Sequence, residues 1–142
     1  GEYSVALSNV PENCTVDGVG AVTVTYPKGW GVDISAASTA GVFTNGKAYF
    51  EVHPPDPLAK DAKGMADSAL KTLLKGATVT AQAAEKIGNN DAYWYAARQG
   101  GTTVRVVGLD APTRVVLVCY VKGGSFDSYR GTFDTMQKSL RF

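Results

Sequence analysis

The sequence predicts an α+β protein in which an antiparallel sheet is flanked by helices. Three observations carry this prediction: strand-like segments come in pairs joined by tight turns, two separate segments show helical spacing of apolar residues, and one strand is apolar on both faces. The chain has 142 residues, of which 44% are hydrophobic and 19% charged. This length is typical of one core. We therefore expect a single domain over residues 1–142, with residues 1–19 as an N-terminal arm or strand.

The first strands lie in the N-terminal part of the chain. Tyr3, Val5 and Leu7 alternate with smaller residues, and residues 21–26 alternate in the same way. A Pro-Lys-Gly sequence then breaks the strand before Trp30, because proline cannot donate to a ladder and glycine favours turns. We expect residues 31–34 to return as a second short strand.

The Asn45-Gly46 pair predicts a two-residue hairpin turn, because both turn positions need a positive φ. Pairing Thr44 with Lys47 then places four residues on one face: Phe43, Ala48, Phe50 and Val52. Four others fall on the opposite, more polar face: Val42, Tyr49, Glu51 and His53.

Two segments show helical spacing. Residues 61–75 carry one apolar stripe: Met65, Ala66, Ala69, Leu70, Leu73 and Leu74. Asp61 lies at the start of this helix, where negative charge suits the dipole, and Gly76 can close its end. Ser125 is the expected N-cap of the final helix. That helix carries large residues spaced alternately three and four positions apart: Phe126, Tyr129, Phe133, Met136 and Leu140.

A second hairpin is predicted over residues 92–109, with its turn at Gly100-Gly101. In this register Trp94, Arg98 and Arg105 share one face, and Arg105 lies diagonal to Trp94, within reach of a cation–π contact. An open face of this kind can bind an anionic ligand or an acidic patch of a partner. The alternative is an outer face covered by arginines beside an exposed loop. Residues 114–122 are apolar on both faces, as in a central strand covered on both sides.

The order of these segments resembles the PsbP-like family, the α-β-α sandwich of a photosystem II extrinsic subunit, a nuclear Ran-binding protein and small bacterial lipoproteins. The resemblance covers roughly residues 20–142. Its carriers are Val22-Thr-Val-Thr-Tyr-Pro-Lys-Gly-Trp30, the helix at 61–75, Asn-Asp-Ala-Tyr-Trp-Tyr at 90–95, the strand at 114–122, and the closing helix with its Ser-Leu-Arg-Phe end. It implies a non-enzymatic accessory or binding role, often outside the cytoplasm. No catalytic residue of the family can be transferred.

Composition argues against several classes of function. The net charge of +1, without a basic stripe, speaks against a nucleic-acid partner. With one histidine, His53, and two distant cysteines, we expect no metal site, no cofactor and no catalytic residues. An imidazole, a carboxylate and a hydroxyl gathered in one hollow would contradict that expectation. Cys14 and Cys119 are either joined in a disulfide or remain two buried thiols.

Two function classes remain open. The first is an extracytoplasmic domain, whether periplasmic, secreted or lipid-anchored, that recognises a protein partner through its sheet edge or loops. Any lipid anchor would lie outside this chain, which begins at Gly1 like a trimmed product. The second is a small-molecule carrier with a pocket between the sheet and a helix, lined by residues such as Trp30, Tyr49 and Trp94. Across both classes, the candidate ligand-binding residues are Trp30, Trp94, Arg98 and Arg105. An enzyme ranks third.

Overall fold

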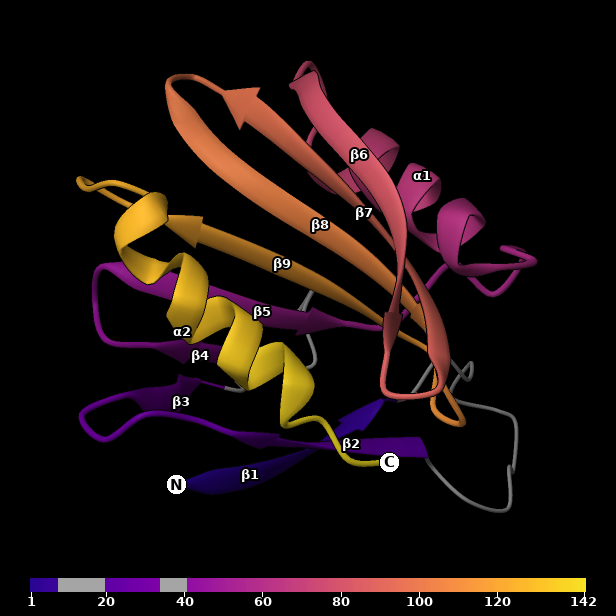
Figure 1. The fold of residues 1–142 in the computed structure, drawn as a ribbon, viewed down its shortest axis with the longest axis horizontal. Coiled ribbons are helices and arrows are strands. Elements are labelled where there is room, and N and C mark those ends of the chain that lie inside the picture. The colour runs from indigo at the N-terminus through magenta and orange to yellow at the C-terminus, as the bar shows by residue number, and fades with distance from the viewer. Residues whose placement is uncertain (8–19, 34–40) are drawn as a thin grey trace.

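The computed structural model describes residues 1–7, 20–33 and 41–142, and their arrangement is shown in Figure 1. The strands in these ranges are β1 (Glu2–Leu7), β2 (Gly20–Thr25), β3 (Gly31–Asp33), β4 (Gly41–Thr44), β5 (Ala48–His53), β6 (Thr78–Ile87), β7 (Asn90–Gln99), β8 (Thr102–Asp110) and β9 (Val115–Val121). The helices are α1 (Ala62–Leu73) and α2 (Asp127–Lys138).

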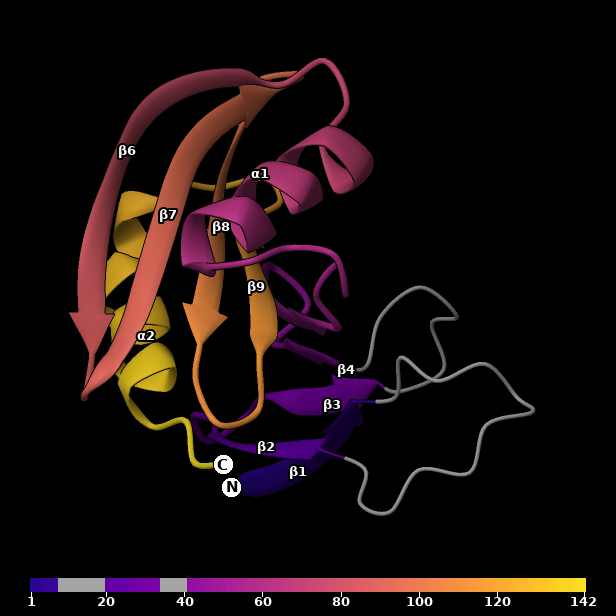
Figure 2. The ribbon, with the colours of Figure 1, turned by 90° about the vertical axis from the view of Figure 1, so that its right-hand side faces the viewer.

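Within the described ranges, seven strands form one antiparallel sheet in the order β3-β4-β5-β9-β8-β7-β6. Helix α1 packs on one face of this large sheet and α2 on the other (Figure 2). Strands β1 and β2 pair separately, and backbone hydrogen bonds between Thr23 and Arg141 tie this ribbon to the end of the chain. The predicted α+β class, with a sheet between helices, is confirmed.

Strand β9 lies in the middle of the large sheet and is buried on both faces, as its apolar sequence predicted. The core is therefore split in two. The cluster on the α2 side includes Phe43, Phe50, Leu117, Cys119, Phe133 and Met136. The cluster on the α1 side includes Met65, Ala69, Val104, Val106, Val116 and Val118. Burying each large apolar side chain stabilises the fold by roughly 1.5–3 kcal/mol.

Helix α1 approaches the sheet closely because β8 carries Gly108 at the contact. A Cβ built on Gly108 would lie 2.2 Å from the carbonyl oxygen of Ala62 and 2.9 Å from the backbone nitrogen of Ala66. The helix begins at Asp61, whose side chain accepts a hydrogen bond from the Gly64 N–H (2.7 Å). The chain leaves the helix through Gly76, which has a φ of +79°.

Two residues of the predicted apolar stripe are not fully buried: Leu70 is half-buried and Leu73 is exposed. Leu73 is 38% exposed, whereas Leu74 is buried. The reason is the placement of α1, which packs mainly on β7 and β8. Its last turn reaches past that contact, and Leu73 borders a hollow next to β5 and β9.

The start of α2 differs from the prediction. Ser125 does not cap the helix with its side chain; its carbonyl oxygen accepts a hydrogen bond from the Ser128 N–H (3.2 Å). Phe126 is already helical, with a φ of −56°, so the first turn closes through backbone groups alone. The predicted apolar stripe is otherwise correct, with Phe133 and Met136 fully buried against the sheet.

The two hairpins had different outcomes. The β7–β8 register is confirmed, with Gln99 opposite Thr102 and both turn glycines at positive φ. In the β4–β5 hairpin the predicted pairing is wrong, because Thr44 lies opposite Tyr49 rather than Lys47. The side chain of Asn45 accepts hydrogen bonds from the N–H groups of residues 47 and 48, which opens the turn, and Asn45 keeps a negative φ. The shift is by two residues, so every side chain keeps its predicted face.

Candidate functional site

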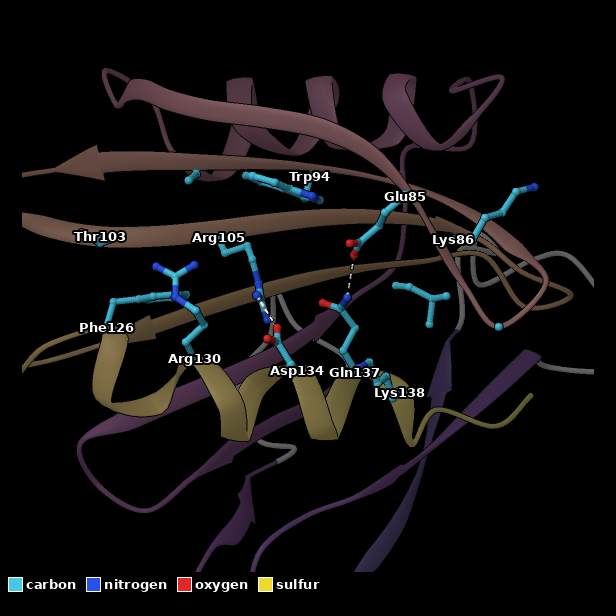
Figure 3. A pocket seen from close by; sticks show the side chains of 13 residues that line it. Glu85, Lys86, Trp94, Thr103, Arg105, Phe126, Arg130, Asp134, Gln137 and Lys138 are labelled. Carbon is cyan, nitrogen blue, oxygen red and sulfur yellow. Dashed lines mark hydrogen bonds and ion pairs between the residues drawn. The ribbon is translucent and has the colours of Figure 1, made fainter.

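A groove runs along α2, between this helix and strands β6, β7 and β8 (Figure 3). It consists of a cavity of about 440 Å³ beside the middle of α2 and a second of about 540 Å³ beside the β7–β8 turn. The two are neighbours that share the lining residues Thr103, Phe126 and Arg130. We call the whole the α2 groove. Its polar and aromatic lining includes Glu85, Trp94, Arg98, Thr103, Arg105, Phe126, Arg130, Asp134 and Gln137.

The groove exists because large side chains separate α2 from one part of the sheet. Phe133 and Met136 anchor the helix in the core. On the β7–β8 side, Trp94 and Arg105 occupy the face that α2 covers. Figure 2 shows α2 behind the bowed β6–β7 part of the sheet. Contact with α2 is therefore made by long side chains rather than by close backbone packing.

Arg105 is the central charged group of the α2 groove. Its Nη1 donates to Oδ1 of Asp134 (2.7 Å), and its guanidinium lies over the ring of Phe126, 5.8 Å from the centroid. The side chain is only 11% exposed. Its Nε and Nη2 are buried, and neither makes a hydrogen bond of good geometry among the described residues, although the guanidinium lies close enough to the Cys119 thiol to lower the pKa of that thiol. A buried guanidinium with unmet donors is costly unless something else satisfies it.

Gln137 adds an unmet acceptor to the same place. Its Nε2 donates to Oε1 of Glu85 on β6 (3.0 Å), which links the helix to the edge of the sheet. Its Oε1 is buried and has no partner within the described part of the chain. Figure 3 shows Arg105, Gln137 and Trp94 projecting into the space between α2 and the sheet. The groove thus combines unmet donors, an unmet acceptor and an aromatic surface.

The structure brings together three of the four candidate ligand-binding residues. Trp94 and Arg105 line the first cavity, and Arg98 lines the second, where its Nη2 makes one long hydrogen bond to the Gly101 carbonyl (3.4 Å). Trp30 packs against the core and does not line the groove. The predicted face is not an open outer surface, because α2 covers it, and the cation–π partner of Arg105 is Phe126 rather than Trp94.

The carrier pocket expected at Trp30, Tyr49 and Trp94 is not formed. Tyr49 lies on the α1 face of the sheet and stacks on Tyr120, with ring centroids 5.0 Å apart. Trp94 lies on the α2 face. The alternation along β5 and β7 already separated these faces, but the sequence could not show which helix covered each one.

Cys119 lies directly opposite Arg105, on β9, and is fully buried. Burial raises the pKa of the Cys119 thiol to about 12, against the lowering effect of the neighbouring Arg105. The thiol is therefore protonated at neutral pH and a poor nucleophile. Cys14 lies outside the described residues, so a disulfide with Cys119 and two buried thiols both stay open alternatives.

A second hollow, of about 510 Å³, lies on the α1 side of the sheet. We call it the β5–β9 hollow; its lining includes Glu51, His53, Leu73, Tyr120 and Lys122. Nε2 of His53 donates to Oε1 of Glu51 (2.8 Å), and the hydroxyl of Tyr120 donates to Oε2 of Glu51 (2.5 Å). The expectation that an imidazole, a carboxylate and a hydroxyl would not meet in a hollow is wrong.

The chemistry of this trio is nevertheless not that of a nucleophile and its base. Nucleophilic catalysis needs the hydroxyl on the imidazole, whereas Glu51 here receives both donors. Burial alone would raise the pKa of Glu51, but the hydrogen bonds from His53 and Tyr120 outweigh it and hold the pKa below its usual value. Burial, reinforced by Glu51, raises the pKa of Tyr120. The arrangement stabilises a carboxylate and leaves the phenol protonated.

Two acidic residues near α1, Asp56 and Asp61, have a structural role. Asp61 caps the helix, and Asp56 accepts hydrogen bonds from the Leu58 N–H (2.9 Å) and the Ser68 hydroxyl (2.9 Å).

Among the described residues, no group of three or more His, Cys, Asp or Glu side chains is placed to hold a metal ion. The helices in these ranges are too short or too polar to cross a bilayer.

The architecture defines a PsbP-like α-β-α sandwich. Cyanobacterial PsbP (CyanoP) from Synechocystis sp. PCC 6803 superposes with a TM-score of 0.63 over 84% of this chain and 85% of that one, at 17% sequence identity. This likeness confirms the fold that the sequence resembled. A crystal structure of a protein from Bacteroides thetaiotaomicron matches 84% of this chain and 44% of its own, with 16% identity and a TM-score of 0.46. No family model and no curated protein matches the sequence.

Proposed function

We propose that this protein is a non-enzymatic binding or accessory domain whose α2 groove holds an anionic group of its ligand. The observation that carries the proposal is Arg105, a buried guanidinium whose Nε and Nη2 have no partner among the described residues. Each unmet buried donor costs about 1–3 kcal/mol, and a ligand that accepts from it would recover that cost. Most buried polar groups of folded proteins are paired, and departures from this rule occur at functional sites.

The charge of the groove supports an anion. Its lining has five basic side chains, Lys86, Arg98, Arg105, Arg130 and Lys138, against three acidic ones, Glu85, Asp127 and Asp134. Arg105 and Arg130 both lie near the ring of Phe126, at 5.8 and 5.3 Å from its centroid. Two guanidinium groups around one ring provide donors and a flat apolar surface at once. Trp94 adds a second aromatic surface.

The size of the groove fits a ligand of moderate mass. The cavity beside Arg105 has about 440 Å³, within the roughly 300–1,000 Å³ of ordinary small-molecule sites. A ligand with a carboxylate or phosphate beside an apolar or aromatic part matches this lining. The proposal requires no catalytic step.

Two further expectations accompany this function. We propose an extracytoplasmic location, based on the resemblance described above; fractionation of host cells expressing the full gene product tests it. We also propose that nucleic acid is not the ligand. Acidic side chains interrupt the basic ones in the groove, whereas nucleic-acid sites carry a continuous basic stripe.

The direct test uses benzoate and its neutral analogue benzamide. With ¹⁵N-labelled protein, we expect benzoate to give saturable amide shifts in β7, β8 and α2, and benzamide to give none of comparable size. Arg105→Met should weaken benzoate binding about tenfold, the usual loss on removing a charge-assisted hydrogen bond. Arg130→Gln offers a second variant at a side chain that is 57% exposed, where a substitution disturbs folding less than one in the core.

Arg141→Gln is the matched control. Its side chain is 62% exposed and pairs with Glu2, away from the groove. Benzoate binding that is equal in all variants, or shifts that map outside the groove, would contradict the proposal.

A further inference from the structure

Building on the proposed function, we infer that the ligand of the α2 groove is an extended acidic segment of a protein partner, with acidic residues at alternate positions followed by an apolar one. The juxtaposition that points to it is a row of three side chains on β7 and β8: Arg98, Arg105 and Trp94. They occupy successive rungs of the hairpin, on the face that α2 covers.

The register defines the spacing of this row. Arg98 lies opposite Thr103, Arg105 opposite Ala96, and Trp94 opposite Val107. Each member of the row is therefore a diagonal neighbour of the next, at about 7–8 Å. Alternate side chains of an extended peptide point the same way and repeat every ~6.6–6.8 Å. A peptide lying along the groove can thus present its first two carboxylates to Arg98 and Arg105 and an apolar side chain to Trp94.

The length of the groove also suits a peptide. Its two cavities are neighbours at Thr103, Phe126 and Arg130, beside a helix of 12 residues. At ~1.5 Å per residue this helix is about 18 Å long. About five residues of extended chain cover that distance at ~3.3 Å each. A single small anion would fill only part of it.

The unmet polar atoms favour a peptide over a simple anion. Arg105 has two buried donors to satisfy, and Gln137 has a buried acceptor, Oε1, without a partner among the described residues. A carboxylate only accepts hydrogen bonds. A peptide supplies carboxylate and carbonyl oxygens for Arg105 and backbone N–H groups for Gln137.

Two arginines of the groove, Arg98 in the row and Arg130 beside it, provide positive charge that complements an acidic segment. Arg98 is exposed and makes one long hydrogen bond, at 3.4 Å, to a backbone carbonyl. Arg130 pairs with the exposed Asp127 on its own helix and lies over the ring of Phe126. Exposed pairs of this kind are worth little, about 0–1 kcal/mol. Both arginines can therefore turn to a partner's carboxylates at small cost.

The experiment uses a fluorescent acetyl-Phe-Ser-Glu-Ser-Glu-Ser-Phe-amide, whose sequence reads the same in both directions, so that chain direction does not matter. Fluorescence anisotropy should show saturable binding, and amide shifts should extend from the Gly100-Gly101 turn to Trp94. The peptide with Gln in place of Glu should bind at least about tenfold more weakly, because it loses two charge-assisted contacts.

Arg98→Gln separates this inference from the proposed function. Arg98 lines only the second cavity. The variant should therefore weaken the peptide about fivefold or more while benzoate binding stays unchanged. Arg141→Gln should change neither.

Each outcome is decisive. If benzoate binds in the groove but the peptide does not, or if the peptide binds equally well with Gln in place of Glu or to Arg98→Gln, the peptide inference is wrong and the proposed function stands. If neither probe binds, both are wrong.

Discussion

Helices α1 and α2 pack on the two faces of the large sheet in different ways. On the α1 side, Gly108 lets the helix backbone approach β8, and the hollow beside it contains a network in which Glu51 accepts from both His53 and Tyr120. On the α2 side, long side chains hold the helix off β6–β8, and Arg105 and Gln137 keep buried polar atoms without partners in the described ranges.

The difference indicates where function lies. A polar network whose members satisfy one another fixes the fold and has little left to offer a ligand. Unmet donors and acceptors in a groove reduce stability in the free protein and gain energy when a ligand arrives. The β5–β9 hollow contains a network of paired groups, whereas the α2 groove contains unmet ones. The cavity beside Arg105 and the β5–β9 hollow are nevertheless similar in size. Pairing, rather than volume, distinguishes the two.

Gly108→Ala should have the largest effect, because it attacks the close approach on the α1 side. The new Cβ would lie 2.2 Å from the Ala62 carbonyl oxygen, so helix or strand must move. We expect a loss of about 2–4 kcal/mol in the free energy of unfolding, measured in urea. Gly131→Ala, in the exposed part of α2 with nothing within 4 Å of its Cβ, should instead be neutral or stabilise by about 0.5–1 kcal/mol. Equal effects would mean that α1 and α2 approach the sheet alike.

Glu51→Gln tests the paired network. The folded-state pKa of Glu51 is below its usual value of 4.5, so the unfolded chain binds the proton more tightly. Stability from this group is therefore fully present above pH ~4.5 and is lost as the pH falls through the folded-state pKa. We expect the variant to be about 1–3 kcal/mol less stable at neutral pH. Its loss of stability on acidification, followed by urea unfolding from pH 7 to 3, should be smaller than that of the wild type. Parallel pH profiles would show that Glu51 is not held as a carboxylate.

Asp61→Ala compares the two helix starts. Asp61 caps α1 with its side chain, so its loss should cost about 1 kcal/mol. Ser125→Ala removes a side chain that makes no cap hydrogen bond at the described start of α2, and should leave thermal unfolding almost unchanged. A larger loss for Ser125→Ala would contradict the observed start of α2.

Arg105→Met should have only a small effect on stability, in contrast to the change in the paired network at Glu51. It replaces a guanidinium with two unmet buried donors by a shorter apolar side chain that keeps an unbranched stem. We expect the free energy of unfolding to stay within about 1 kcal/mol of the wild type or to rise, although the pair with Asp134 is lost. Chemical denaturation beside the benzoate titration measures both properties. A strongly destabilised Arg105→Met protein would show that Arg105 serves the fold rather than a ligand.

Local patterns predicted much of the architecture. The Gly100-Gly101 turn alone determined the β7–β8 register, because two glycines at positive φ allow only a short loop. It therefore also placed Trp94, Arg98 and Arg105 on one face. The Asn45-Gly46 pair predicted the wrong strand register. The Asn45 side chain accepts hydrogen bonds from the N–H groups of residues 47 and 48, and this arrangement competes with a two-residue turn. Short-range rules fail where a side chain can replace a backbone partner.

The contacts that the sequence did not predict, in the β5–β9 hollow and in the α2 groove, join residues that lie far apart in the chain. Tyr120 lies 69 positions from Glu51, and only the neighbouring positions of β5 and β9 bring them together. The partners of Arg105, Phe126 and Asp134, come from a helix whose side of the sheet the sequence left open. No periodicity signals such contacts, because each strand's pattern fixes its faces but not its neighbours.

By itself, the sequence determined the elements, their buried faces and the row of Trp94, Arg98 and Arg105, because these follow from bond geometry and side-chain periodicity within a few residues. Only the tertiary structure decided that α2 covers this row and leaves a groove with unmet donors, while Glu51, His53 and Tyr120 satisfy one another on the other side. Such pairing depends on which distant segments meet, and that is set by the packing of the whole core.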